Sequence, residues 1–189
     1  MYQKYHTEAI VLGGRERGES DRSVALFTSE FGMVHARASA VRSEKSRMRY
    51  ALQHFTRCKV SLVKGKSGWR VAGATALESY PQGEGAKVFA RAATLVRRLV
   101  QGEERNEYLY ETLVEAHQAC RSEHADTLPV VEIVCVARIL FALGYISTEA
   151  LSTALFTHTA FTGESLLEAD SLKDKLLASI NRALTEAQL

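Results

Sequence analysis

The spacing of apolar residues changes once along the chain, close to Pro81, and this change limits the fold more than any other feature. Up to about residue 79, short apolar runs alternate with turn residues, as in β-strands. Beyond that point, apolar residues recur three and four positions apart, as on amphipathic helices. The stretch from Pro81 to Gly85 combines a proline with two glycines, so we place a domain boundary there. The sequence predicts one domain over 1–80 and an α-helical domain over 85–189.

Five short strands are expected in the first domain. They cover Thr7 to Leu12, Ser23 to Thr28, Met33 to Ala38, Phe55 to Val63 and Trp69 to Leu77. Five short antiparallel strands suit a small closed barrel, and the OB-fold barrel binds oligonucleotides on one face and through two of its loops. Those loops would be Gly13 to Asp21 and Lys64 to Gly68. On the third strand, His35 and Arg37 should share the outer face.

The second domain is predicted to be all-α. Helical spacing or helix signals mark four segments, Phe89 to Val100, Leu109 to Cys120 (with Asn106 as its cap), Leu128 to Leu143 and Ser147 to Leu155. The third is almost wholly apolar and ends at Gly144, so we expect it to be the buried central helix. A capping box at Ser171 to Asp174 should open a final amphipathic helix. The fold class is therefore α+β, a five-stranded OB-fold barrel followed by a helical domain.

Charge is divided between the two domains as well. Residues 1–80 hold 14 basic and 7 acidic side chains, a net charge of +7, whereas the remainder carries −5. Between Arg37 and Arg70, ten Lys or Arg accompany a single acid, Glu44. Basic residues without interleaved acids differ from ordinary surface charge, and guanidinium groups suit phosphate. We interpret this segment, densest from Arg42 to Arg49, as a phosphate-facing surface, with a merely solvated charged loop as the alternative.

The expected nucleic-acid contacts are the basic side chains of this segment together with one aromatic residue. Tyr50 stands beside Arg49 and is the favoured base-stacking residue. Phe55 and Trp69 lie in predicted strands and are expected in the barrel core. The full predicted set is Arg37, Arg42, Lys45, Arg47, Arg49, Tyr50, Arg57, Lys59, Lys64, Lys66 and Arg70.

No pattern points to an enzyme. Gly65-Lys66-Ser67 ends like a nucleotide-binding P-loop, but the glycine needed five residues earlier is Val60 here. Glu16, Glu19 and Asp21 are interspersed with arginines, which favours surface ion pairs over acid/base chemistry or Mg²⁺ binding. We therefore predict no catalytic residue and no cofactor.

A metal site and an extracellular location are not expected either. His117, Cys120 and His124 fall near one helix face, but the local sequence supplies no fourth zinc ligand. Cys58, Cys120 and Cys135 are odd in number and widely spaced, which indicates buried, reduced thiols. The chain has no apolar run of roughly 18 residues and no signal-peptide pattern. We expect a cytoplasmic protein that binds no metal.

A series of short motifs in the first domain resembles a known family. The motifs are Glu8-Ala-Ile-Val-Leu12, Gly18-Glu-Ser-Asp-Arg22, Leu26-Phe-Thr28, Phe31-Gly32, Ser46-Arg47 and Ala51-Leu-Gln-His-Phe-Thr56. In order and spacing, they closely resemble the N-terminal half of the bacterial DNA repair protein family RecO, although His54 stands where the family usually has Pro. Leu143-Gly-Tyr145 is similar to the end of that family's central helix.

This resemblance implies an OB-fold followed by a helical domain that binds single- and double-stranded DNA and anneals complementary strands. It also implies partners: RecR, the single-stranded DNA-binding protein, and RecA, which is loaded onto strands coated by that protein. Many members bind zinc through four cysteines after the central helix, but residues 146–163 contain no cysteine here.

Another departure concerns the family's arginine near the start of the central helix, which meets the acidic tail of the single-stranded DNA-binding protein. Ile133 and Val134 fill the nearest positions in this chain. Arg97, Arg98 or Arg138 could take over that docking role. Two other functions remain open from the residues: an adaptor whose basic face binds an acidic peptide tail, and an RNA-binding OB module.

Overall fold

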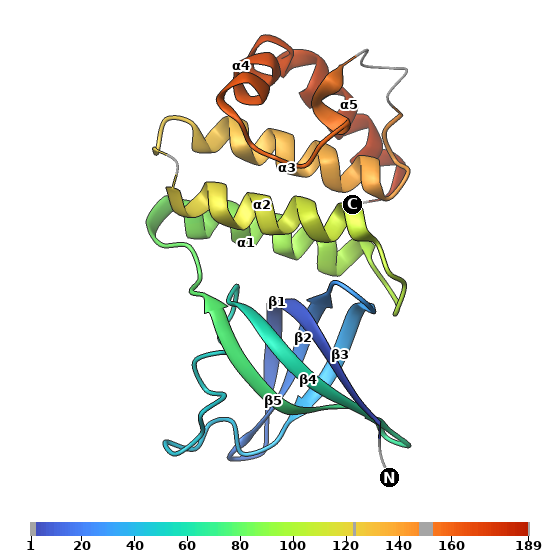
Figure 1. Cartoon of the computed structure of the whole chain (residues 1–189). Helices are drawn as coiled ribbons and strands as arrows, with labels where there is room; N and C mark the ends of the chain where they lie inside the picture. Colours follow the sequence, from blue (N-terminus) through green and yellow to red (C-terminus); the bar gives the residue numbers. More distant parts are fainter. Residues whose placement is uncertain (1–2, 123, 148–152, 189) are drawn as a thin grey trace. The chain divides into compact units, whose positions relative to one another are not determined.

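The structure is a computed structural model that describes residues 3–122, 124–147 and 153–188 (Figure 1). Its internal contacts divide the chain into two compact units. The first contains the residues up to Tyr80 together with Arg97–Tyr110, and the second contains Pro81–Val96 together with the residues from Glu111 onward. The predicted division into domains at residues 80–85 stays a prediction.

The first unit contains a closed five-stranded barrel, as the sequence predicts. Its strands are β1 (Lys4–Arg17), β2 (Asp21–Thr28), β3 (Gly32–Ala38), β4 (Arg57–Gly65) and β5 (Gly68–Glu78). They pair in the order β1-β2-β3-β5-β4, and β1 closes the barrel by pairing with β4. All pairs are antiparallel except β3 with β5. The predicted α+β class with an N-terminal OB-type barrel is thus confirmed.

Alternating side chains build the barrel core. On β3, Val34, Ala36 and Ala38 are buried while His35 and Arg37 are exposed, as their alternation predicts. Trp69 is only 6% exposed and belongs to the core, also as predicted. The barrel therefore directs the polar residues of its strands outward, where they are available to a ligand.

Two predictions about the barrel are wrong in their boundaries. The loop expected over Gly13 to Asp21 is mostly strand, because β1 continues to Arg17 past an irregularity between Val11 and Gly13, and only residues 18–20 turn. Phe55 is not in a strand, since β4 begins at Arg57. Phe55 has φ +64 and is half-buried in the turn before β4, where its backbone N–H donates to the Val11 carbonyl at 2.6 Å.

The helical segments largely follow the predicted periodicity. They are α1 (Gly83–Leu99), α2 (Glu107–Ser122), α3 (Leu128–Ala142), the 3-10 helix η2 (Ala154–Phe156), α4 (Gly163–Ser171) and α5 (Lys173–Glu186). Asn106 caps α2, because its side-chain oxygen accepts from the Leu109 N–H at 2.9 Å. As predicted, α3 is the buried helix of its unit. It contacts α4 and α5 and is followed by Gly144 at φ +79.

The C-terminal predictions need correction. Ser171 does not open the last helix: it ends α4, which the sequence reading missed, and its hydroxyl donates to the Glu168 carbonyl. The last helix, α5, starts at Lys173 without a side-chain cap. The short helix expected over Ser147 to Leu155 lies mostly outside the described residues, which show only η2 at its end.

The three cysteines are free and buried, in agreement with their predicted role as small apolar residues. Burial raises the pKa of both Cys58 and Cys120 to about 12. Within the described ranges, no helix is both long and apolar enough to cross a membrane.

Candidate nucleic-acid interface

The basic loop from residue 39 to residue 56 joins β3 to β4 and is folded back on itself by successive turns. Ser46 N–H donates to the Ser43 carbonyl at 3.0 Å, and Leu52 N–H donates to the Met48 carbonyl at 3.0 Å. Val41, Ala51 and Leu52 are at most 3% exposed and belong to the barrel core. The loop is therefore anchored by its apolar residues, which leaves its charged side chains outside.

The outward side of this loop concentrates accessible positive charge. Lys45, Arg47 and Arg49 are exposed, and no ion pair involves them within the described part of the chain. Arg42 is also exposed, and it contacts the Gly18 carbonyl and the Glu16 carboxylate, each at 3.3 Å. Tyr50 beside them is 69% exposed, more than a core residue would be. The structure thus brings four predicted cations and the predicted stacking residue onto one loop.

A cavity of about 330 Å³ at the foot of this loop is lined by Arg22, Arg42 and Arg49, with Val41 and Gln53. Sequence reasoning missed Arg22, which precedes the basic segment. Its pairing opposite Ala38 on β3 carries it to the start of the loop, where its guanidinium donates to the Leu52 carbonyl at 3.0 Å. Burial lowers the pKa of Arg22, since the charged form loses hydration. Three arginines around one cavity can hold an oxyanion such as a phosphate.

Arg37 anchors the loop rather than standing free. Its Nε donates to Asp21 at 2.9 Å, and the same carboxylate accepts from the Ala40 N–H at 2.9 Å. The Ala40 N–H and then Arg37 hold the pKa of Asp21 below its usual value. The ion pair fixes the start of the loop and offsets the charge of Arg37.

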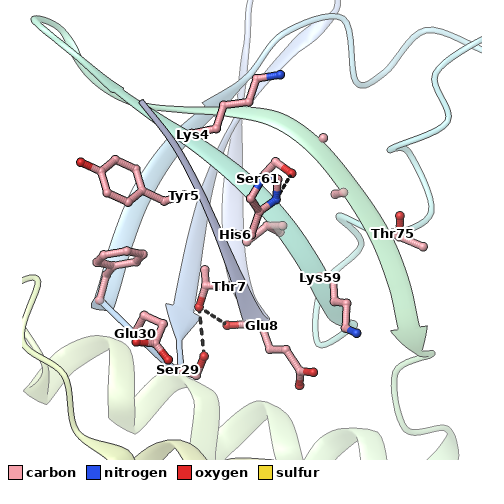
Figure 2. Close-up of a pocket in the computed structure, with 14 residues that line it drawn as sticks. Lys4, Tyr5, His6, Thr7, Glu8, Ser29, Glu30, Lys59, Ser61 and Thr75 are labelled. Atoms are coloured by element: carbon pink, nitrogen blue, oxygen red, sulfur yellow. Dashed lines mark hydrogen bonds between the residues drawn. The ribbon is translucent and has the colours of Figure 1, made fainter. Parts of the chain in front are cut away.

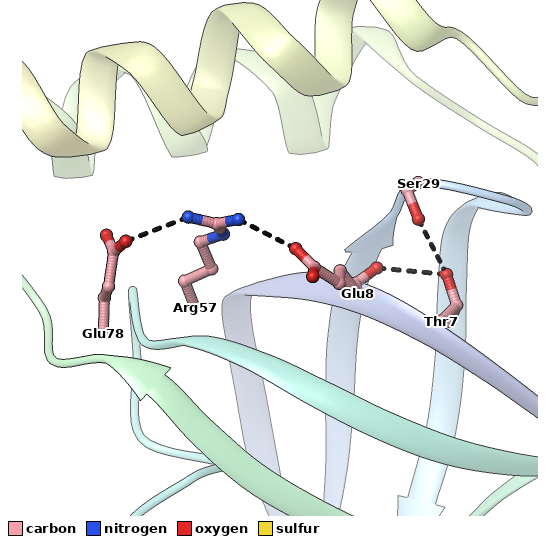
Figure 3. A network of polar contacts seen from close by, with 5 residues as sticks. All are labelled: Thr7, Glu8, Ser29, Arg57 and Glu78. Carbon is pink, nitrogen blue, oxygen red and sulfur yellow. Dashed lines mark hydrogen bonds and ion pairs between the residues drawn. The ribbon is translucent and has the colours of Figure 1, made fainter.

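Arg57 is also engaged, in a polar network at the start of β4 (Figure 3). Its guanidinium donates to Glu8 at 2.8 Å and to Glu78 at 2.9 Å, and its side chain is 19% exposed. The network continues through Thr7 to the Ser29 hydroxyl at 3.0 Å. The charge of Arg57 is therefore met by two carboxylates, so its predicted contact with DNA has little in the structure to favour it.

Lys64 contacts the connection between α1 and α2, which belongs to the same unit. Its ammonium group donates to Glu103 at 2.7 Å and lies 5.0 Å from the centroid of the Trp69 ring. The Trp69 indole N–H donates to the same carboxylate at 2.8 Å. Lys59, Lys66 and Arg70 are exposed on β4, the β4–β5 turn and β5, respectively.

A groove of about 900 Å³ runs along β1 and β4 (Figure 2). Two cations, Lys4 and Lys59, and two acids, Glu8 and Glu30, line it. Because the charges are mixed, the groove favours a polyanion less than the loop surface does.

The predicted docking arginines lie in different settings. Arg97 and Arg98 are exposed in the last turn of α1, and their docking role stays a prediction. Arg138 is fully buried and donates to the carbonyls of Leu155 at 2.9 Å, Thr159 at 2.6 Å and Ala160 at 3.2 Å. It fastens this segment to α3, out of reach of a partner's acidic tail.

Metal ligands do not gather in the described residues, where no three His, Cys, Asp or Glu side chains meet. Of the helical residues weighed as ligands, His117 is fully buried against the Phe89 ring, whereas His124 is exposed.

Comparison with known proteins bears on the barrel. The family model described as "Recombination protein O N terminal" matches residues 1–80, which include the barrel and the basic loop. Residues 1–80 of this chain therefore match the N-terminal domain of the RecO family. The family resemblance of the motifs is thereby confirmed.

Curated RecO relatives match part of the chain. The DNA repair protein RecO of Desulfitobacterium hafniense (strain DSM 10664 / DCB-2) is 46% identical over 77 residues, 41% of this chain and 28% of the relative. That of Gloeothece citriformis is 38% identical over 81 residues, 43% and 29% of the two chains. The RecO protein of Pelotomaculum thermopropionicum is 31% identical over 128 residues, which are 66% of this chain and 50% of the relative. The chain thus spans between 28% and 50% of these three relatives.

Proposed function

We propose that this protein is a DNA-binding recombination mediator that acts in DNA repair without covalent chemistry. Its relatives bear the name DNA repair protein RecO. The observation that carries the proposal is the anchored loop, which presents Lys45, Arg47 and Arg49 beside the exposed ring of Tyr50, with no ion-pair partner for these cations among the described residues. Cations next to an accessible aromatic ring are the features by which proteins bind single strands.

Annealing follows from this electrostatic arrangement. Two complementary strands repel each other through their phosphates, and a basic surface that neutralises phosphates releases their condensed counterions. The protein then raises the local concentration of both strands and lowers their repulsion. Base pairing supplies the free energy of the product, so no catalytic residue is needed.

The proposed partners are single- and double-stranded DNA, RecR and the single-stranded DNA-binding protein, with RecA loaded as the outcome. Contact with the acidic tail of the single-stranded DNA-binding protein would fall to Arg97 and Arg98, which are exposed. The proposed location is the cytoplasm, where such partners act on DNA.

A strand-annealing assay with two complementary oligonucleotides tests the proposal. The loop variant Lys45→Ala/Arg47→Ala/Arg49→Ala should anneal at least about tenfold more slowly, because it loses three phosphate contacts. The control variant Lys173→Ala/Lys175→Ala/Arg182→Ala removes the same charge from exposed positions of α5 and should anneal at the normal rate. A folded loop variant that anneals at the wild-type rate would refute the proposal. An intact protein that binds an acidic peptide but no oligonucleotide would support the adaptor function instead, and a preference for RNA would support an RNA-binding module.

A further inference from the structure

A second positively charged site lies on the outer face of β1, β2 and β3, and none of the residues that line it belongs to the basic loop. Arg15 on β1 pairs with Ser23 on β2, and Ala25 on β2 pairs with His35 on β3. Residues that pair directly across antiparallel strands share one face of the sheet. Arg15 and His35 are exposed, and the residues between them are small.

Arg97 completes this site. It belongs to the same unit as the barrel and, with Arg15 and His35, lines a cavity of about 310 Å³ whose remaining walls are Gly14, Ser23 and Ala25. Its guanidinium lies over Gly13, where a β-carbon would come within 2.7 Å of it. A glycine at position 13 therefore leaves room for the Arg97 side chain against the strand.

The electrostatics of the cavity favour an anion. No acidic side chain lines it, and neither Arg15 nor Arg97 takes part in an ion pair in the described part of the molecule. His35 adds a ring N–H that can donate. Two guanidinium groups and an imidazole over a floor of small residues allow the close approach of a phosphate.

This site is separate from the basic loop. Along β3, the Arg37–Asp21 ion pair stands between His35 and the first loop residues, so the positive charge is offset there. The cavity at the foot of the loop is lined instead by Arg22, whose pairing partner Ala38 faces the barrel core. The first unit thus offers two cationic cavities that share no lining residue.

We propose that the site formed by Arg15, His35 and Arg97 binds the phosphate backbone of a second nucleic-acid strand while the loop holds the first. The inference rests on the proposed function, because it explains how one barrel can hold both strands that are to be paired. Phosphate contacts position a strand without reading its sequence, as such a role requires.

Two non-complementary oligonucleotides of about eight nucleotides, one with a donor and one with an acceptor fluorophore, test this inference, since one such strand can fill an OB barrel site. Wild-type protein should bring the two together and give energy transfer. The outer-face variant Arg15→Ala/His35→Ala/Arg97→Ala should bind one strand with unchanged affinity and bind the second at least about tenfold more weakly. The α5 control variant should behave as the wild type.

Gly13→Ala serves as a second variant because it displaces the Arg97 guanidinium and leaves every charge in place. Gly13→Ala should also lower the affinity for the second strand. A purely non-specific charge effect would not explain this loss, because the variant keeps every charge. The inference is overturned if wild-type protein binds single strands but never two at once, or if the folded outer-face variant retains full energy transfer. If wild-type protein binds no oligonucleotide at all, the proposed function itself fails.

Discussion

The guanidinium of Arg22 lies where β2, β3 and the basic loop meet. It donates to the Leu52 carbonyl at 3.0 Å and lines the cavity with Arg42 and Arg49. Burial removes water from the guanidinium group, and this loss of hydration lowers the pKa of Arg22. One side chain thereby couples the position of the loop to the positive charge that the loop presents.

Arg22→Met should destabilise the protein and weaken oligonucleotide binding together. The substitution keeps much of the packing volume but leaves the Leu52 carbonyl without its donor, which costs about 1–3 kcal/mol. Urea unfolding measures the free energy of unfolding. Arg17→Met, at an exposed position near the end of β1, is the matched control. Equal stability of the two variants would show that the Arg22 contact contributes nothing.

Tyr50 should contribute to single-strand binding through its ring. Its 69% exposure leaves the ring accessible, and a stacked base is worth about 1–3 kcal/mol. Tyr50→Ala should therefore weaken single-strand affinity by roughly tenfold or more without lowering the free energy of unfolding, whereas Tyr50→Phe should bind normally. Fluorescence anisotropy with a labelled oligonucleotide measures the affinities, and normal binding by the alanine variant would exclude stacking.

At the scale of elements, the connection between α1 and α2 fastens to two turns of the barrel. Glu103 accepts from Lys64 on β4 and from Trp69 on β5. At the β2–β3 turn, Met33 N–H donates to the Gly102 carbonyl at 3.2 Å. Gly32 there has φ +63, and a β-carbon would lie 2.1 Å from the Glu104 carbonyl oxygen, so only glycine fits.

The Glu103 contacts should make stability depend on pH. Hydrogen bonding to Lys64 lowers the pKa of Glu103 below its usual 4.5. A lowered carboxyl pKa means that its stabilising contribution is present above about pH 4.5 and is lost as pH falls through the folded-state pKa. Trp69 is the only tryptophan, so its fluorescence reports urea unfolding from within this contact.

Glu103→Gln should be less stable than the wild type near pH 7, and the difference should shrink as the medium becomes more acidic than the folded-state pKa. Glu104→Gln is the neighbouring control and should follow the wild type. A constant difference between Glu103→Gln and the wild type across this range would mean that the carboxylate charge is not involved.

Elements with regular periodicity could be predicted from sequence, and irregular ones could not. Alternation on β3 and the apolar character of α3 fixed both elements to within a residue or two. The predicted start of α5 was wrong because the spacing of Ser171 and Asp174 resembles a capping box. The N-cap in the structure is Leu172, whose side chain cannot cap a helix. The predicted end of β1 was wrong because two consecutive glycines, Gly13 and Gly14, are typical of a turn. In the structure the strand continues past them, and the Arg97 guanidinium lies over Gly13.

In the candidate site, too, some residues could be predicted from the sequence and others could not. A run of basic residues in the loop is visible in the sequence, and so is Tyr50. The contributions of Arg22 and Arg15 depend on strand register, which brings together residues distant in sequence. The pairing of Arg57 with Glu8 and Glu78 also arises across strands, and it offsets the charge of a residue predicted to contact DNA.

At the scale of the whole molecule, positive charge belongs to the part of the chain that carries the family match, residues 1–80, and net negative charge to the rest. This division favours a nucleic-acid contact through the barrel and leaves the helical residues for other contacts. The chain spans only part of the length of its relatives, and the barrel carries the proposed DNA contacts.

The most direct test is a titration of a labelled single strand at several salt concentrations with the wild type and the loop variant. If the wild type engages about five phosphates, log affinity should fall against log salt with a slope of roughly −3 to −4. The loop variant Lys45→Ala/Arg47→Ala/Arg49→Ala should bind more weakly, with a slope shallower by about 2. Wild-type protein that does not bind, or a loop variant with the same affinity and slope, would contradict the account.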